Sequence, residues 1–490
     1  MSASNSPMMA GAATRRAQRD DRRKADAAAS ARAATKAAAK AAPVAPIALE
    51  LPKVSPVTAA LGRRRLVVLV ALTLYVFGLV MVASASSGEE LLRGNYQWAL
   101  LQKQAIYGFV GLCAMWVAMR MPLDLVRRLA RPMVWICVAL VVAVMIPGVG
   151  VDGNGATRWI NLGFFQLQPS EPLKLAVIAM IAAHLSRTAP PVHWMRDFVR
   201  SPGGVGLGLA GVLVGVQSDL GSGLVVGAST VVLYVLAGTR WDVLWRTIGP
   251  ALALVILSIV TEDYRRQRFF AFVDPWANPE AGGYQLVQAL IAIGSGGPFG
   301  VGLGHSVQKI TFLPEAHTDM IFAITVEELG FFGVIMVLGS FSVLAAVGTR
   351  IAMRARTRFS ALLAAGITAM VVGQAAVNIA GVTGVMPLTG IPLPLVSYGG
   401  SSLIMTLVSL GLLANIATER RPPRSFTIEQ PEVEAFDIDD YDEDFEDAHA
   451  FDDEDDHTSP EHDGTDEPAP AGAGRRGRNR RAPRTGARRR

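Results

Sequence analysis

The sequence predicts an all-α integral membrane protein with ten transmembrane helices, and three observations support this prediction. The 490 residues are 51% hydrophobic, and most apolar residues form long runs between Arg65 and Glu419. Charge is segregated outside these runs, with twenty acids and no lysine or arginine in residues 429–467, and nine arginines and no acid in residues 475–490. Basic residues also recur in every second connection between the runs. This pattern excludes a soluble multidomain enzyme.

The two cysteines, Cys113 and Cys137, both lie inside apolar runs. A pair of cysteines in such positions excludes a disulfide framework and a thiolate metal site.

Composition divides the chain into three parts. Residues 1–62 form an alanine-rich basic arm, residues 63–420 the membrane domain, and residues 421–490 a polar tail with the acidic block 429–467 and the arginine-rich tip 475–490. Both ends are predicted to be disordered, because they lack apolar periodicity. The acidic block also holds spaced apolar residues, as in segments that fold on a partner: Phe436, Ile438, Tyr441, Phe445 and Phe451. A merely solvated tail is the simpler interpretation.

Each predicted span has about 20 apolar residues, the length that a bilayer core requires. In order, the spans are 66–86, 98–120, 132–148, 170–187, 204–218, 221–238, 243–261, 319–347, 360–382 and 399–417.

The placement of arginines predicts the orientation of the spans. Arginines precede the first span, follow the last, and fill the connections after the second, fourth, sixth and eighth spans. Under the positive-inside rule, both termini are therefore cytoplasmic. The long connections 149–169 and 262–318 then face outward, the second forming a large extracytoplasmic loop between helices 7 and 8. Long loops between spans are usually functional.

The second outer loop and the fourth span contain candidate charged residues. Arg158 and Trp159 are expected in an amphipathic stretch on the membrane surface. Glu171 and Lys174 enter the fourth span three residues apart, which places them on one helical face. A structural ion pair is an equally good interpretation of Glu171 and Lys174.

Asp219 lies in the motif QSDLGSG, at the outer joint between two spans. The glycine and serine that follow favour a capping carboxylate over a functional one.

The long outer loop carries three clustered arginines, Arg265, Arg266 and Arg268, beside two phenylalanines. Such a cluster is typical of a segment that meets anionic headgroups or a phosphate. Residues 285–293 are predicted to form a short amphipathic or re-entrant helix.

Acidic residues also occur where the eighth span begins. Glu315, His317 and Asp319 lie at its mouth, and Glu327 and Glu328 follow two turns further in. Because an ionisable residue at membrane depth is costly, Asp319 and Glu327 are interpreted as functional. Composition alone does not separate a catalytic carboxylate from a proton-coupling one, and a helix N-cap is the structural alternative for Asp319.

Five segments of the sequence, taken together, are specific enough to indicate a protein family. They are NGATRWINLGFFQLQPSE at 154–171, QSDLGSG at 217–223, DYRRQRFFAFVDPWANPEAGGYQL at 263–286, HTDMIFAITVEELG at 317–330 and VSYGGSSL at 396–403. They resemble the SEDS family, the ten-span shape, elongation, division and sporulation proteins of bacteria, over residues 63–418. The segment VQKITFLPEAHTD is more similar to the division branch, typified by FtsW, than to the RodA branch. Ser218 departs from the family, which usually has proline before this aspartate.

The resemblance implies a peptidoglycan glycosyltransferase that polymerises lipid II into β-1,4 glycan strands at the outer face of the membrane, with undecaprenyl pyrophosphate as leaving group. The family's essential carboxylate corresponds to Asp319, the expected catalytic base. Its characteristic basic positions correspond to Arg158 and Lys174. The complete substrate-binding set is predicted to be Arg158, Lys174, Glu171, Asp219, Arg265, Arg266, Arg268, Lys309, His317, Ser397 and Ser401.

The same resemblance implies partners and an ion. A divalent cation, Mg²⁺ or Mn²⁺, is plausible beside the pyrophosphate. The expected partners are lipid II, the nascent glycan, a class B penicillin-binding protein acting as transpeptidase, and other division proteins at the septum. The C-terminal tail is expected to meet the tubulin-like ring protein, and no nucleic acid partner is expected.

Three alternatives remain open from sequence. A lipid II flippase would need charged residues through the full membrane thickness, and Glu327, Glu328, Gln374 and Asn378 are its candidates. A RodA-type elongation polymerase differs only in branch. A scaffold that recruits division proteins through its tails could coexist with either activity.

Overall fold

The computed structural model describes residues 62–418, except 93, 95, 154–155, 162, 164, 188–194, 216, 218, 262 and 278–282. The predicted basic arm, the acidic block and the arginine tip lie outside the described residues, as does Ser218. The fold and the site below concern the described part of the chain.

A helix lies over each predicted span. These helices are α3 (Arg63–Leu92), α4 (Ala99–Ala118), α5 (Leu123–Ala143), α6 (Ser170–Leu185), α8 (Pro202–Gly215), α9 (Leu220–Leu236), α10 (Trp241–Thr261), α14 (Ile321–Arg354), α15 (Arg358–Val382) and α16 (Gly400–Ile416). Within the described ranges, α3, α10, α14 and α15 are long and apolar enough to cross a membrane. The mostly helical membrane fold is therefore confirmed, whereas the number of spans stays a prediction.

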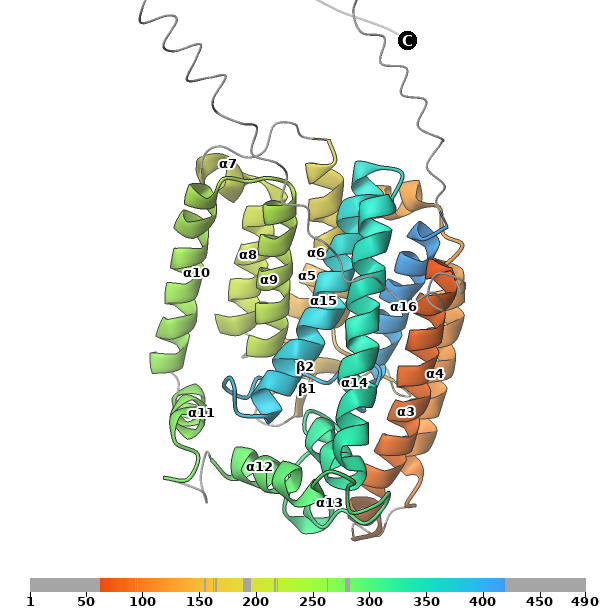
Figure 1. The fold of residues 1–490 in the computed structure, drawn as a ribbon. Helices are drawn as coiled ribbons and strands as arrows, with labels where there is room; N and C mark the ends of the chain where they lie inside the picture. Colours follow the sequence, from red (N-terminus) through yellow and green to blue (C-terminus); the bar gives the residue numbers. More distant parts are fainter. Residues whose placement is uncertain are drawn as a thin grey trace, which may run out of the picture. The chain divides into compact units, whose positions relative to one another are not determined.

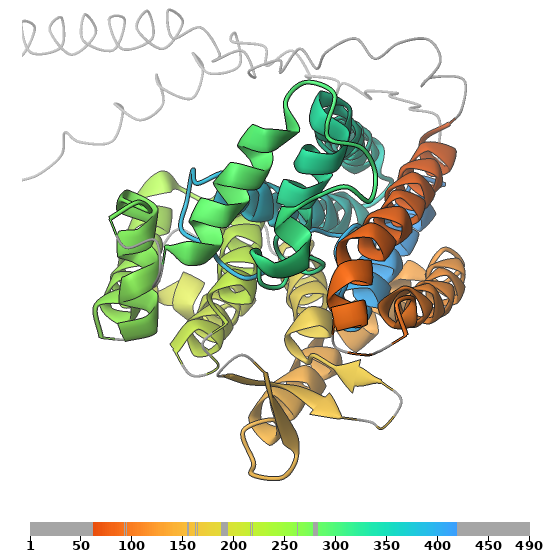
Figure 2. The same ribbon diagram turned by 90° about the horizontal axis from the view of Figure 1, so that it is seen from below.

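A small antiparallel sheet corrects the all-α class. Its strands are β1 (Gly150–Gly153), β2 (Ala156–Asn161) and β3 (Gln166–Leu167), in the order β1-β2-β3. Arg158 and Trp159 therefore lie on the strand β2, and their place at the membrane surface stays a prediction. The strands have two to six residues each, too few for an alternating pattern to stand out. Figure 2 shows the sheet at the periphery of the helices.

Helix α15 is central to the described bundle, packing against α6, α9, α14 and α16 (Figure 1). Small residues permit this close packing. A Cβ atom added at Gly366 would lie 2.5 Å from the Ile178 side chain of α6 and 3.2 Å from Leu233 of α9. In membrane proteins small residues let helix backbones approach, which gains van der Waals contact. The position of α15 matters because two of its side chains hydrogen-bond to residues that form or support the candidate site.

The two ends of the bundle differ. The short helix α7 (Met195–Arg200) lies at one end, and α11 (Asp263–Val273), α12 (Tyr284–Gly296) and α13 (Gln308–Thr311) lie at the other (Figure 1). Helix α12 confirms the short helix predicted over 285–293. Helix α11 was not predicted, because its arginines obscure any apolar face.

Helix α14 is broken at Gly330, whose φ of 57° and ψ of −138° are not helical. The loop before α13 docks on this break. The Phe331 amide donates to the Pro298 carbonyl at 3.0 Å, and the Val301 amide donates to the Glu327 carbonyl at 2.9 Å. A side chain at Gly330 would collide with the Gly300 backbone. The loop thus fixes the first part of α14, which follows Asp319.

Two buried acids lie beside the break. Lys309 Nζ donates to Glu328 Oε1 at 2.6 Å and to Ser84 Oγ of α3 at 2.9 Å. Glu327 accepts hydrogen bonds from the Ser306 hydroxyl and from the Val307 amide. Both acids are therefore satisfied by nearby protein groups, as a structural role requires.

Candidate functional site

A cavity of about 760 Å³ lies within the described bundle. Its wall combines β2 and β3, the beginnings of α6, α9 and α16, one face of α10 and α11, the loop before α14, and the non-helical segment 386–392. Non-helical backbone is tolerated at membrane depth where it lines a cavity. Seven predicted site residues line this cavity: Arg158, Glu171, Asp219, Arg268, His317, Asp319 and Ser401.

Asp319 lies in the turn before α14. The N-cap of that helix is Met320, and no side chain caps it, so the N-cap alternative for Asp319 is wrong. Its carboxylate accepts a hydrogen bond from Thr318 Oγ1 at 3.3 Å, and its main-chain carbonyl accepts one from Asn378 Nδ2 at 2.8 Å. The side chain is partly covered, and its open side faces the cavity.

Burial raises the pKa of Asp319 from its usual 3.8 to about 6. The Arg268 guanidinium opposes this rise in the pKa, and the negative charge of Glu315 adds to it. A carboxylate with a pKa near 6 is ionised at neutral pH and still basic enough to accept a proton in a reaction.

Arg268 is the cation of the long loop that reaches the cavity. It donates to the Leu388 carbonyl and to Gln285 Oε1, each at 3.5 Å. A Cβ atom added at Gly390 would lie 3.8 Å from Arg268 Nη1 and 3.9 Å from Asp319 Oδ2, so the two charged groups flank the same glycine. Arg266 is instead exposed and donates to the Val260 carbonyl at 3.3 Å. The Arg265 side chain lies outside the described residues.

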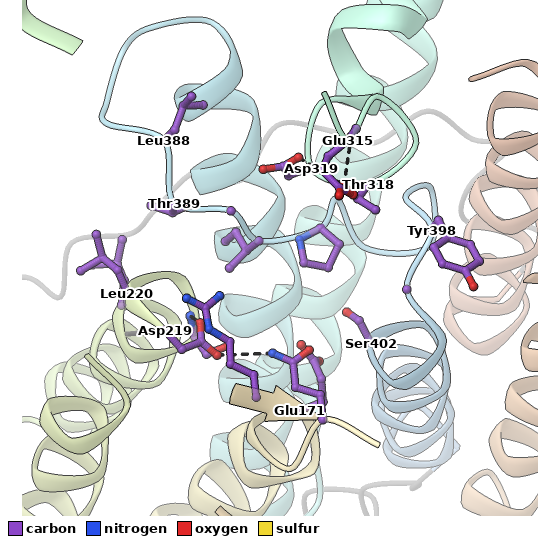
Figure 3. A pocket seen from close by; sticks show the side chains of 18 of the residues that line it. Glu171, Asp219, Leu220, Glu315, Thr318, Asp319, Leu388, Thr389, Tyr398 and Ser402 are labelled. Carbon is purple, nitrogen blue, oxygen red and sulfur yellow. Dashed lines mark hydrogen bonds between the residues drawn. The ribbon is translucent and has the colours of Figure 1, made fainter. Parts of the chain in front are cut away.

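Asp219 lies across the cavity from Asp319, as Figure 3 shows. It caps α9, with Oδ1 accepting from the Ser222 amide at 3.0 Å, so the predicted capping role is confirmed. Oδ2 accepts from Ser170 Oγ at 3.2 Å and from Gln168 Nε2 at 3.4 Å. Asp219 thus orders one wall of the cavity and exposes little free acceptor capacity.

The predicted pair on α6 is present, with Lys174 Nζ 2.9 Å from Glu171 Oε1 and both side chains buried. Only Glu171 lines the cavity, because Lys174 points behind it and donates to Gln374 Oε1 of α15 at 2.7 Å. Arg158 of β2 faces the cavity, and its Nε donates to the Gln217 carbonyl at 3.3 Å.

Four other predicted positions have structural partners. Ser401 lines the cavity and links β3 to α16 by hydrogen bonds to the Gln166 carbonyl, 2.9 Å, and from the Gln168 amide, 3.0 Å. Ser397 lies outside the cavity wall and accepts from the Leu393 amide at 2.8 Å. Lys309 is held in the Glu328 ion pair, so this geometry does not support its predicted contact with substrate. His317 lines the cavity, with its ring 5.7 Å from that of Tyr398.

Sequence reasoning missed part of the wall. Tyr107, Gln168 and Gln285 line the cavity, as do residues 386–392. The glutamines carry a usable signal, because each is a polar side chain next to an apolar run. The segment 386–392 (MPLTGIP) carries another, because two prolines and a glycine follow a span without any polar loop.

A family model described as "Cell cycle protein", which covers FtsW, RodA and SpoVE, matches residues 64–422. The chain belongs to the FtsW/RodA/SpoVE family. Family membership and the apolar helices together make it a multi-pass membrane protein.

Curated members of the FtsW/RodA/SpoVE family are similar over most of their length. The probable peptidoglycan glycosyltransferase FtsW of Geobacter metallireducens is 39% identical over 355 residues, covering 72% of this chain and 94% of the relative. The stage V sporulation protein E of Bacillus subtilis is 39% identical over 359 residues, covering 73% of this chain and 97% of the relative.

Solved structures of the family agree with the fold. A chain of a peptidoglycan synthase complex, described as coordinating polymerization and crosslinking, has a TM-score of 0.60 and 29% identity, with 72% of this chain and 97% of that chain covered. The rod shape determining protein RodA of Thermus thermophilus has a TM-score of 0.54 and 29% identity, with 73% and 97% covered.

Proposed function

We propose that this chain is a peptidoglycan glycosyltransferase that polymerises lipid II into β-1,4 glycan strands during septal cell-wall synthesis. The observation that supports it most is Asp319, a carboxylate of raised pKa facing a cavity that also holds Arg158 and Arg268. Curated relatives carry the name FtsW and this activity. The relatives named FtsW support the division branch, at 39% identity against 29% for the solved RodA, and the sporulation relative is equally similar to this chain.

The reaction requires one base. Asp319 takes the proton from the 4-hydroxyl of the acceptor GlcNAc as that oxygen attacks the anomeric carbon of the donor sugar. The new glycosidic bond forms, the bond from the anomeric carbon to the pyrophosphate oxygen breaks, and the proton remains on Asp319. Inversion of the anomeric carbon places the base on the face away from the leaving group. Such a base contributes roughly 10²–10⁴ in rate.

Undecaprenyl pyrophosphate leaves without protonation where cations stabilise its charge. Arg158 and Arg268 line the cavity and supply that charge. Lys174 acts from behind the wall, orienting Glu171 through their 2.9 Å ion pair. Among the described cationic side chains of the predicted substrate-binding set, this arrangement supports Arg158 and Arg268 as the pyrophosphate contacts.

In the proposed topology the ten helices cross the membrane and both termini are cytoplasmic. The segment between α10 and α14, with α11, α12 and α13, forms the large extracytoplasmic loop. The arginine-bearing connection of α7 lies at the end opposite α12 and α13 (Figure 1). The cavity then opens toward the leaflet in which flipped lipid II is exposed.

A divalent cation fits this site only as a companion of the substrate. No group of three or more His, Cys, Asp or Glu side chains that could hold a metal occurs among the described residues. Mg²⁺ is often bound by one or two carboxylates together with substrate phosphates, and Glu171, which lines the cavity and pairs with Lys174 through Oε1, would supply one. The ion would neutralise charge on the leaving pyrophosphate.

The proposed partner is a class B penicillin-binding protein that cross-links the glycan. The similarity to a chain of a polymerization and crosslinking complex supports such a pairing. The sequence contains one S-x-x-K, at residues 306–309, but neither the S-D-N nor the K-T-G motif that accompanies it in penicillin-binding proteins.

Polymerisation of purified lipid II by the purified full-length chain tests the function. The wild type should form glycan strands, and Asp319→Ala should not. Lipid II translocation without polymer formation would support the flippase instead. That alternative is weakened by Glu327 and Glu328, which are satisfied by protein groups beside the helix break.

A further inference from the structure

One face of α15 presents two amide side chains to the cavity wall. Gln374 and Asn378 lie one helical turn apart, and both are buried, with 3% and 4% of their surface exposed. Polar side chains inside a membrane bundle are uncommon and usually have a function. Both amides face the non-helical segment between α15 and α16, whose residues 386–392 line the cavity.

Asn378 joins that segment to the turn of Asp319. Its Nδ2 donates to the Asp319 carbonyl and to the Ile391 carbonyl, each at 2.8 Å. Both partners are main-chain acceptors, so only the NH₂ group can lie between them, which fixes the orientation of the amide. The Oδ1 atom has no hydrogen-bond partner among the described residues. Among the described residues, the Asn378 side chain therefore forms hydrogen bonds only through its NH₂ group.

Gln374 joins the same segment to the opposite wall. Its Nε2 donates to the Pro392 carbonyl at 3.0 Å, and its Oε1 accepts from Lys174 Nζ at 2.7 Å. Lys174 in turn holds Glu171, which lines the cavity. The adjacent carbonyls of Ile391 and Pro392 thus accept hydrogen bonds from Asn378 and Gln374, which lie on adjacent turns of α15.

We propose that Asn378 and Gln374 are positioning residues for glycosyl transfer, setting the distance between Asp319 and the Glu171–Lys174 pair through α15 and residues 391–392. This inference rests on the proposed role of Asp319 as base. Neither amide lines the cavity, so each acts on the reaction only through the groups that it holds.

The energetics separate positioning from folding. A single interhelical hydrogen bond in a membrane protein contributes little net stability, so removing one should not unfold the chain. A displacement of about 1 Å at the reacting groups can cost about 10²-fold in rate. The rate is therefore the more sensitive property.

The experiment measures lipid II polymerisation and thermal unfolding of full-length Asn378→Ala, Gln374→Ala and Thr368→Val. Thr368 is the matched control, because it is buried on the same helix and its hydroxyl donates only to the Ala364 carbonyl of that helix. We expect kcat to fall about tenfold to hundredfold for the two amide variants with KM changed less than about threefold. Thr368→Val should keep the wild-type kcat.

The pH profile of kcat gives a readout that a merely structural role would not move. Asp319 faces Arg268 of α11 and Glu315 and His317 of its own loop, and Asp219 and Glu171 lie on the opposite wall. Releasing the Asp319 turn in Asn378→Ala should weaken its attraction to Arg268. The acidic limb of the profile should then move to higher pH.

Asn378→Ser provides a second variant, because a hydroxyl can still donate to one of the two carbonyls. Its kcat should fall between those of the wild type and Asn378→Ala. Folded amide variants with wild-type kcat would overturn the inference, as would a loss equal to that of Thr368→Val. Full activity of Asp319→Asn would instead remove the base on which the inference rests. Inactive Asp319→Asn beside fully active amide variants would refute the positioning role alone.

Discussion

Asp319 accepts fewer hydrogen bonds from protein side chains than Asp219 on the opposite wall and lacks the lysine partner of Glu171. Asp219 accepts from a main-chain amide, a hydroxyl and a side-chain amide, and Glu171 is paired with Lys174. Asp319 accepts one long side-chain hydrogen bond, from Thr318 at 3.3 Å. Its oxygens therefore remain available to a substrate hydroxyl, whereas those of Asp219 and Glu171 already organise the wall.

Asp319→Asn should abolish polymerisation without lowering stability. Burial raises the pKa of this carboxyl, so its charged form is disfavoured in the folded protein at pH 7.5. A neutral amide removes that cost, and the melting temperature should be equal to or above that of the wild type. A purely structural role would instead lower stability and retain activity. Lipid II polymerisation and thermal unfolding of one preparation decide between the two.

The pH dependence of kcat should show an acidic limb near pH 6, the value to which burial raises the pKa of Asp319. The base works when ionised, so activity rises with pH through this region. Arg268→Gln should move the limb to higher pH, because Arg268 lowers this pKa, and Glu315→Gln should move it to lower pH. Limbs that stay in place in both variants would show that another group titrates.

Titration of Asp319 should also make folding stability fall as pH rises, in the range where kcat increases. The pKa of Asp319 is higher in the folded chain than the 3.8 of a free carboxyl, so the folded state binds the proton more tightly. This contribution to stability is fully present below about pH 3.8 and is lost as pH rises through about 6.

At the scale of elements, the segment 386–392 is held in place through its main chain. Its carbonyls at Leu388, Ile391 and Pro392 accept hydrogen bonds from Arg268, Asn378 and Gln374. Gly390 has a φ of +69°, a conformation that side chains disfavour, and a Cβ atom there would lie in van der Waals contact with both Arg268 and Asp319. Helix breaks at such points let a backbone line a cavity within a membrane bundle.

Gly390→Ala should lower kcat more than its loss of stability explains. The added methyl group would contact both Arg268 and Asp319, while the positive φ adds strain of order 1 kcal/mol. Gly384→Ala is the matched control, because Gly384 has a φ of +73° and neighbours only Leu286 and Leu290. Equal losses of kcat in the two variants would assign the effect to backbone strain.

The pair of Lys309 and Glu328 should be a stability element. Lys309→Met leaves Glu328 buried with 0% of its side chain exposed and without its cation, which should cost about 3–5 kcal/mol of unfolding free energy. Lys309→Met combined with Glu328→Leu should recover most of this loss. Thermal unfolding measures both variants. A destabilised double variant would mean that the pair holds the loop by more than charge.

At the scale of the whole molecule, hydropathy predicted the helices and the outer loops that hold the site. Runs of apolar residues are a strong signal, so every predicted span coincides with a helix. The pairings across the bundle were not predictable, because Lys309 meets Ser84 and Asn378 meets Asp319 only after α3, α14 and α15 have packed. Candidate charges could be named from sequence, whereas the choice of Arg268 over Arg266 required the orientation of α11.

Deleting residues 429–490 should leave polymerisation of lipid II in vitro intact and weaken septal localisation. The segment follows α16 in the sequence, at the end of the chain predicted to be cytoplasmic. The arginine tip would attract anionic lipid at about 1 kcal/mol per charge, leaving the acidic block free for a cytosolic partner. Fluorescence localisation in dividing cells and a polymerisation assay report on the two roles separately. Normal localisation of the shortened chain would exclude recruitment by the tail.

The part of the cavity wall at residues 386–392 also bears on inhibition. A compound that hydrogen-bonds to main-chain atoms of these residues would contact atoms that every amino acid shares, so few substitutions would remove its binding groups. A bulkier residue at Gly390 could block the compound, but the same side chain would crowd Arg268 and Asp319. Resistance acquired at this position would therefore reduce cell-wall synthesis together with drug binding.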